Sequence, residues 1–431
     1  MTWNEAIVVL LAGLQTKIAM QNAIALHRDC RTGSMGRVSP VALGKRHFVY
    51  KFVLVMFAFL TLYATPAVAA PDGAPMPDAA PMKVAIVGLV HGHVDGFLKG
   101  GALTPAGGIL NRPDVQLVGI VEPRRDLFDA YAQRYHLPVS LYFRSIQELV
   151  AQAHPQAILV FTAPSEHRRV IEESAALGVH VMVEKPLTTS YKDALAIADA
   201  AQRGRIHVLV DLETTWYPSN TEAFHLLHQG ALGEIVKTVI RDGHQGPQLI
   251  NVPPEFLAFL NDPKQNGGGA LYDFGCYGAN LMTWLMDGEA PVSVTAVTKQ
   301  LQPNLYPNVD DEAEIILNYK NAVSIIQASW NWPFGVKQMD LYGRTGYIKA
   351  IDSERIEIRI QGDDAPQNGK GQALKAPYDD SLHYLVAVVN GDIQEGDSLS
   401  SLKNNVLVSE ILDAARQSAQ TGKTVGLPLA K

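Results

Sequence analysis

Cysteine is scarce in this sequence, and recognisable metal-binding spacings are missing. Its 431 residues include only Cys30 and Cys276, too few for a disulfide framework or a thiolate metal site. The 13 histidines form no His-Glu-x-x-His or comparable spacing, so we expect no metal. Disulfide-stapled scaffolds and the metalloenzyme classes marked by such motifs are therefore excluded.

An excess of basic charge is also missing from most of the chain. Residues 1–70 carry seven Lys and Arg against two Asp and Glu, yet the whole chain has a formal net charge of −7, so the remainder is acidic. An acidic surface repels polyanions. We therefore expect no nucleic-acid partner.

No apolar run is long enough to span a membrane. The longest candidate, residues 52–64, has 13 residues, whereas a spanning helix needs roughly 20. It follows a basic segment, 45–51, and precedes Ala-x-Ala at 67–69, the pattern of a signal peptide. We expect cleavage near Ala69, a periplasmic or secreted protein, and no stable membrane insertion after processing; an uncleaved anchor is the alternative.

The export route and the start of the chain have alternatives. Residues 44–49 (GKRHFV) resemble a degenerate twin-arginine signal, which exports folded proteins, although an ordinary Sec signal has similar features. Translation from Met35 would give the signal normal proportions. We divide the chain into an N-terminal extension with signal peptide (1–70), a Pro- and Ala-rich linker (71–81) and two domains, 82–210 and 211–431.

Buried strands alternate with helices in the first of these domains. Apolar runs at 83–87, 115–121, 157–161 and 180–183 lack polar alternation, which is typical of strands covered on both faces of a parallel sheet. Helical segments separate them, which predicts a doubly wound Rossmann domain.

A glycine-rich turn follows the first strand. Gly88, Val90, His91, Gly92 and His93 stand between that strand and a helix from about residue 94, an arrangement that suits a pyrophosphate. Val90 and His93 occupy positions where G-x-G-x-x-G has glycine. A purely structural turn is the alternative.

Further cofactor contacts are expected at the carboxyl ends of the other strands. Glu122 can bind ribose hydroxyls and slightly favours NAD, whereas Arg124 or Arg125 could hold the 2′-phosphate of NADP. The ends of the fourth and fifth strands supply the remaining candidates: Thr162, Pro164, His167, Glu184 and Lys185.

These features together resemble the Gfo/Idh/MocA oxidoreductases. The resemblance rests on the glycine-rich turn, the T-x-P-x-x-H-like turn at 162–167 and Glu184-Lys185-Pro186, and it extends over 83–429. It implies an NAD(P) cofactor, a sugar or polyol substrate, and a C-terminal α+β domain on a largely antiparallel open sheet through which copies associate. Strand-like segments at 235–241, 292–299, 313–317, 323–329, 337–342 and 356–360, with few helices between them, agree with that sheet.

The resemblance also places an acid–base pair. In residues 267–285, Asp273 and Tyr277 are spaced i and i+4, on one face of an expected helix, and Tyr stands where many family members have His. This matches the glucose–fructose oxidoreductase and dihydrodiol dehydrogenase branch, where Tyr is the acid–base group. A nearby Lys185 would lower the pKa of the phenol, and Asp273 would orient Lys185 or bind substrate. Alone, each could be an ordinary surface or packing residue.

Further residues are candidates for contact with the substrate. Trp216 and Tyr217 could line a sugar cleft, with aromatic packing as the alternative. His244, and His383 on an expected helix 381–390, could contact substrate, with a structural role as the alternative for both.

The sequence therefore predicts an oxidoreductase that transfers a hydride between a nicotinamide and a CH–OH group of a carbohydrate or polyol. Outside the cytoplasm its cofactor would have to be held tightly. The alternatives are an NAD-dependent glycosidase of the same family and a non-catalytic sugar-binding protein that retains the fold.

Overall fold

The computed structural model describes residues 80–430. The expected signal peptide, its cleavage near Ala69, the alternative start at Met35 and most of linker 71–81 lie outside that range. Within it, no helix combines the length and apolar character needed to cross a bilayer.

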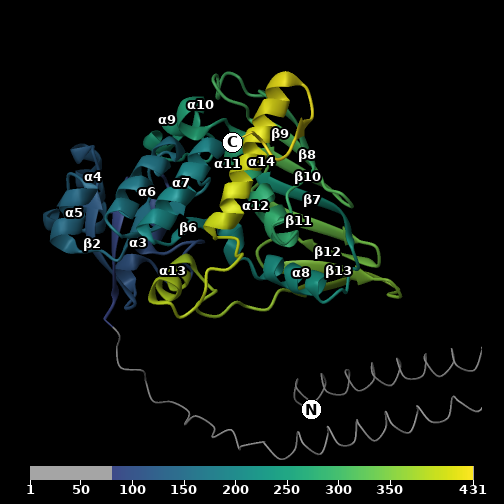
Figure 1. Ribbon diagram of the computed structural model, residues 1–431, viewed down its shortest axis with the longest axis horizontal. Coiled ribbons are helices and arrows are strands. Elements are labelled where there is room, and N and C mark those ends of the chain that lie inside the picture. Colours follow the sequence, from purple (N-terminus) through teal and green to yellow (C-terminus); the bar gives the residue numbers. More distant parts are fainter. Residues whose placement is uncertain (1–79, 431) are drawn as a thin grey trace, which may run out of the picture. The chain divides into compact units, whose positions relative to one another are not determined.

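The first sheet has six parallel strands in the order β3-β2-β1-β4-β5-β6, which confirms the doubly wound prediction. Figure 1 shows this part of the chain in purple to teal. Its strands are β1 (Met82–Val87), β2 (Val115–Val121), β3 (Tyr142–Phe143), β4 (Ala157–Val160), β5 (His180–Glu184) and β6 (Val208–Asp211). The accompanying helices are α3 (Val94–Lys99), α4 (Arg125–Tyr135), α5 (Ile146–Ala153), α6 (His167–Ala176) and α7 (Tyr191–Gly204).

Local sequence explains where these elements begin. Helices α5 and α7 start after Ser145 and Ser190, whose hydroxyls accept N–H groups of the first turn. All four residues of β4 are buried, as expected for a central strand covered on both faces. The carboxyl ends of the strands therefore form one edge, where ligands of such folds bind.

The second sheet has nine strands in the order β14-β13-β12-β11-β7-β10-β9-β8-β15. Only the β7–β10 pair is parallel, so the prediction of a largely antiparallel sheet is confirmed. Its strands are β7 (Ile235–Gly243), β8 (Ser293–Lys299), β9 (Glu312–Asn318), β10 (Val323–Ser329), β11 (Val336–Gly343), β12 (Gly346–Ala350), β13 (Arg355–Ile360), β14 (Gln367–Lys370) and β15 (Val425–Gly426). The helices of this part are α8 (Pro218–His228), α9 (Pro254–Leu260), α10 (Pro263–Asn266), α11 (Ala270–Asp273), α12 (Gly275–Leu285), α13 (Ser381–Asn390) and α14 (Leu402–Thr421).

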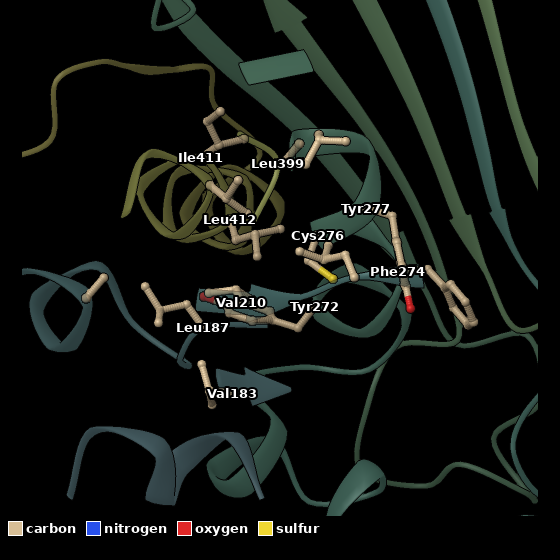
Figure 2. Packing of buried hydrophobic residues seen from close by; sticks show 14 of the residues in the cluster. Val183, Leu187, Val210, Tyr272, Phe274, Cys276, Tyr277, Leu399, Ile411 and Leu412 are labelled. Carbon is tan, nitrogen blue, oxygen red and sulfur yellow. The ribbon is translucent and has the colours of Figure 1, made fainter. Parts of the chain in front are cut away.

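Two long-range packing contacts tie the sheets together. Helix α14 packs on α7 and α12, and one cluster of buried residues joins Val183 and Val210 of the first sheet to Tyr272 and Leu412 (Figure 2). Helix α13 comes late in the sequence but packs on the first sheet, where Leu382 and Leu385 join a second cluster. One continuous apolar core therefore joins the two sheets.

Candidate active site

Lys185 and Asp273 form a buried ion pair at the carboxyl edge of β5. The Lys185 ammonium donates to the carboxylate and, at 3.1 Å, to the main-chain oxygen of Asp273. Both side chains are 5% exposed, and the other carboxylate oxygen of Asp273 accepts the indole N–H of Trp330 at 2.9 Å. Asp273 therefore orients Lys185.

The pair stays charged despite its burial. Burial acts to raise the pKa of Asp273, but the Lys185 ammonium lowers it below its usual value. Burial likewise acts to lower the pKa of Lys185, and attraction to Asp273 raises it instead. Lys185 is therefore an ammonium at neutral pH.

Tyr277 lies beside this pair but not on the same helix as Asp273. Helix α11 ends at Asp273, Phe274 interrupts it, and α12 begins at Gly275, so the expected single helix carrying both residues is wrong. The Tyr277 and Phe274 rings lie at the edge of the packed cluster (Figure 2), with 6.0 Å between their centroids. The Lys185 ammonium lies 5.4 Å from the Tyr277 ring centre.

The expected lowering of the phenol pKa is also wrong for this structure. Burial raises the pKa of Tyr277 well above its ordinary value, and Glu213 adds to that effect. Lys185 does not reverse the shift, because Asp273 neutralises its charge. Tyr277 is therefore a neutral phenol at pH 7, and its hydroxyl has no hydrogen-bond partner among residues 80–430.

A cavity of about 530 Å³ is lined by Lys185, Asp273 and Tyr277, by the turn after β1, and by residues of β7 and β11. Two charged lining residues, Glu213 and Lys337, were not predicted from the sequence; their side chains pair at 2.9 Å. Tyr217 also lines the cavity and donates to Glu213 at 2.5 Å. Burial acts to raise the pKa of Glu213, but Lys337 and the Tyr217 hydroxyl lower it to about 2. Each lysine of the cavity thus has its own carboxylate.

Of the candidates Trp216, Tyr217 and His383, only one lines the cavity. Tyr217 lines the cavity, whereas Trp216 donates its indole N–H to Asp211 at 3.1 Å and packs against Tyr384. His383 of α13 contacts Asp379 at 2.7 Å and does not line the cavity. His244 does line it. The packing alternative thus describes Trp216, and the structural alternative describes His383.

The glycine-rich turn has the expected place between β1 and α3. Gly88 has φ +85°, and a Cβ there would lie 2.6 Å from a methyl group of Thr162, so glycine is required. Within residues 80–430 the N–H groups of Val90 and Gly92 find no acceptor, while those of Leu89 and His91 do. Two unpaired N–H groups at this position fit a pyrophosphate.

Other cofactor candidates serve the chain's own structure. Glu122 is 2% exposed, and its two oxygens accept the N–H groups of Leu89 and Arg124 at 2.8 and 2.9 Å. Buried His167 joins two turns, contacting the main-chain oxygens of Pro186 at 3.1 Å and Thr162 at 3.3 Å. Pro164 is buried, and the Thr162 hydroxyl is buried without a partner. These side chains shape the cofactor edge.

Helix α9 covers the outer side of the turn. The Phe256 ring occupies the space beside Gly92, where a Cβ would lie 2.8 Å from it, and it packs 4.3 Å from the His91 ring. Glu255 of the same helix contacts Arg124 at 3.4 Å. This contact could not be predicted, because segment 244–266 carries no motif.

The side chains of His91 and His93 both contact Glu184, and the His91 ring also packs against Phe256 of α9. His93 Nδ1 lies 3.0 Å from Glu184 Oε1, and His91 Nε2 lies 3.8 Å from Glu184 Oε2. His91 and Glu184 are buried, while His93 is 31% exposed and lines the cavity.

Comparison with known proteins gives two family matches. Residues 82–212 match an oxidoreductase family with an NAD-binding Rossmann fold, and residues 221–349 match the GFO/IDH/MocA C-terminal domain. Together the two segments cover more than half of the chain.

Curated relatives and solved structures agree with these matches. A trans-1,2-dihydrobenzene-1,2-diol dehydrogenase from Xenopus laevis is 29% identical over 318 residues, 70% of this chain and 89% of the relative. A D-apiose dehydrogenase from Rhizobium rhizogenes is 23% identical over 62% of this chain and 78% of its own. In fold, the chain is similar to an aldose–aldose oxidoreductase from Caulobacter crescentus complexed with glycerol (TM-score 0.67, 20% identity, 80% of this chain and 100% of that one). It is also similar to an inositol dehydrogenase homolog complexed with NAD+ from Azotobacter vinelandii (TM-score 0.68, 17% identity, 81% and 98%).

Proposed function

The chain belongs to the Gfo/Idh/MocA oxidoreductase family, and we propose that it reduces a carbonyl group of an uncharged sugar or polyol derivative, with Tyr277 as the proton donor. One observation carries this proposal. The Tyr277 phenol is neutral, lacks a partner within residues 80–430 and lines a cavity that also contains the Lys185 ammonium. A neutral phenol is equipped to give a proton to an oxygen that becomes an alkoxide.

The residues divide the work of that step. Lys185, oriented by Asp273, donates a hydrogen bond to the substrate oxygen and stabilises negative charge as it develops there. Tyr277 supplies the proton. The nicotinamide, when bound, supplies or accepts the hydride at the neighbouring carbon. The reverse reaction requires Tyr277 to take the proton back.

Charge pairing in the cavity supports an uncharged substrate. Lys185 is neutralised by Asp273 and Lys337 by Glu213, so neither ammonium is left for a substrate carboxylate. The Tyr217 hydroxyl and the Glu213 carboxylate offer hydrogen bonds to hydroxyl groups. The relatives named for dihydrodiol and apiose dehydrogenases act on molecules of this kind.

NAD rather than NADP is proposed as the cofactor. The Val90 and Gly92 N–H groups would hold the pyrophosphate. Arg124, one candidate partner for a 2′-phosphate, is already flanked by Asp126 at 2.6 Å and Glu255 at 3.4 Å, and Arg125, the other candidate, contacts Asp129 at 2.8 Å. Carboxylates that are already paired with these guanidinium groups compete with a 2′-phosphate for them. The affinities for NADH and NADPH should therefore be measured side by side.

We also propose export and self-association. The N-terminal pattern supports a periplasmic or secreted location, which N-terminal sequencing of mature protein from its own host would test. Exposed apolar side chains on three neighbouring strands, Val297, Ile316 and Val323, support association through the outer face of the nine-stranded sheet.

The experiment for the main proposal uses the purified full chain with NADH or NADPH and a panel of keto-sugars and keto-polyols. We expect oxidation of the reduced cofactor with uncharged substrates and loss of that rate in Tyr277→Phe. Nitrophenol release from aryl glycosides without net cofactor turnover would favour the glycosidase instead. Ligand binding without any turnover would favour a non-catalytic binding protein.

A further inference from the structure

We propose that His91, His93 and Glu184 bind one divalent transition-metal ion of the zinc type, with an open coordination position facing the active-site cavity. This goes beyond the proposed function, which uses none of these side chains. It also departs from the expectation, drawn from sequence spacing, that the chain binds no metal. That expectation considered contiguous motifs, whereas this set combines a His-x-His turn with a glutamate from a distant strand.

The spacing of the ligand atoms suits a tetrahedral site. Zinc binds imidazole nitrogen and carboxylate oxygen at about 2.0–2.2 Å, and tetrahedral geometry then places ligand atoms about 3.3 Å apart. His93 Nδ1 lies 3.0 Å from Glu184 Oε1, and His91 Nε2 lies 3.8 Å from Glu184 Oε2. These two nitrogen–oxygen distances lie on either side of that value. All three ligand atoms lie within 4.8 Å of one another.

The Glu184 carboxylate gives a second, independent indication of a cation. It is 1% exposed, and a buried carboxylate is costly unless it is paired. Its Oε2 accepts the main-chain N–H of Lys185 at 3.3 Å. Within residues 80–430, its only salt-bridge partners are the two histidines, because the neighbouring Lys185 ammonium is bound to Asp273. A divalent ion between the three side chains would supply the missing charge.

The other histidine–carboxylate cluster of the described chain shows the contrast. Asp379, Asp380 and His383 also lie close together, but Asp380 accepts a 2.8 Å contact from the Arg112 guanidinium. That cluster has its own positive charge. It therefore has less need of a metal than the site around Glu184.

Access is provided through His93. This residue lines the cavity together with Lys185, so a fourth ligand, water or a substrate hydroxyl, could approach from that side. One contact must change on loading. Coordination through His91 Nε2 places the ring proton on Nδ1, which now faces the His93 N–H at 3.3 Å. The turn would shift to release this long contact, while the N–H groups of Val90 and Gly92 would stay available for an anion.

The test measures metal binding by the full chain, without reference to turnover. Chelator-treated protein is titrated with Zn²⁺ by calorimetry and with Co²⁺ by visible absorption, and its metal content is measured after dialysis. We expect one equivalent and a tetrahedral Co²⁺ spectrum. In His93→Ala and Glu184→Gln, we expect the spectrum to disappear and Zn²⁺ affinity to fall by more than about 10-fold, the lower end of the change reported for supporting residues of metal sites.

A matched control is His207→Ala, which removes a histidine paired with a single carboxylate, Glu395, at 3.2 Å. This variant should bind metal as the unmodified chain does. Circular dichroism establishes that each variant is folded. The proposal is overturned if folded Glu184→Gln keeps the Co²⁺ spectrum, or if the unmodified chain binds less than half an equivalent. Neither result depends on whether a sugar substrate is found, so the proposed function would stand or fall separately.

Discussion

The Lys337 ammonium lies 4.0 Å from the centre of the Tyr277 ring, nearer than the Lys185 ammonium at 5.4 Å. A cation over an aromatic face is attracted to the ring electrons and also favours ionisation of the phenol. Of these two ammonium groups, the one nearer to the Tyr277 ring therefore comes from β11, outside every motif of the sequence.

Replacing Lys337 by methionine should make Tyr277 a weaker base. Removing the cation leaves Glu213 unopposed beside the phenol, so the pKa of Tyr277 should rise further. Alcohol oxidation, which needs the phenolate, should fall by about 10-fold for each pKa unit of increase. Carbonyl reduction at neutral pH should change much less. The check is the pH dependence of kcat in both directions, and equal losses in both would contradict this role.

Tyr277→Phe should lower kcat by about 10²–10⁴-fold, the usual contribution of a positioned acid or base, while KM stays within a few-fold. Only the hydroxyl is removed, so packing against Phe274 should persist. Steady-state kinetics provide the measurement, with Tyr272→Phe as a control that removes a buried hydroxyl bound to Asp413 instead. A loss of the same size in the control would assign the effect to packing.

Phe256→Ala should speed the entry of dinucleotide. The ring now covers Gly92, and its removal opens the side of the turn that a pyrophosphate must reach. We expect a faster association rate for NADH by stopped-flow fluorescence. Phe259→Ala, also on α9 and buried at 3% exposure, controls for general loosening of the helix. An unchanged rate in Phe256→Ala would show that the ring does not obstruct binding.

Asp242 should make stability depend on pH. Burial raises its pKa from 3.8 to about 7, although Lys337 acts to lower it; Glu213 acts to raise it, and Lys185 to lower it. Since the folded state holds this proton more tightly than the unfolded chain, stability should decrease as pH rises from about 4 to about 7. Ionising the buried carboxyl would cost up to about 4 kcal/mol. Asp242→Asn should flatten this dependence in urea unfolding, and an identical slope would show that Asp242 does not cause it.

Ile316→Glu should weaken self-association. Ile316 is 41% exposed on β9, near exposed Val297 and Val323 of the neighbouring strands, so a charge there would disrupt an apolar contact between copies. Light scattering after size-exclusion chromatography gives the mass. Leu249→Glu, at an exposed apolar residue away from the sheet, should have no such effect. A monomeric unmodified chain would refute the association itself.

The fold could be predicted from sequence where the pattern is local. The unbroken apolar run of β4 and the serine caps of α5 and α7 each specify their own element. Strands β12 and β14 were missed: β12 follows β11 through a tight turn, and β14 (QNGK) contains no apolar residue, so neither shows an isolated period-two pattern.

The site was predictable only in part, for a similar reason. Lys185, Asp273 and Tyr277 belong to local motifs, and the structure brings them to one cavity. Glu213, Lys337 and Phe256 come from segments without motifs, and only the folded chain shows what they face. The direction of the Tyr277 pKa shift depends on burial and on Glu213, neither of which can be obtained from the spacing of Lys185 and Tyr277.

Helix α14 restricts how far the two halves of the protein can move apart. Asp413 accepts the N–H of Tyr191 at 2.6 Å, and Arg416 donates to the main-chain oxygen of Thr189 at 3.0 Å, so this helix fastens the start of α7 to the second sheet. A wide hinge motion of the two halves would have to break those contacts and the apolar core around them. Small molecules should instead enter and leave through local movement of segment 244–266, several of whose residues line the cavity.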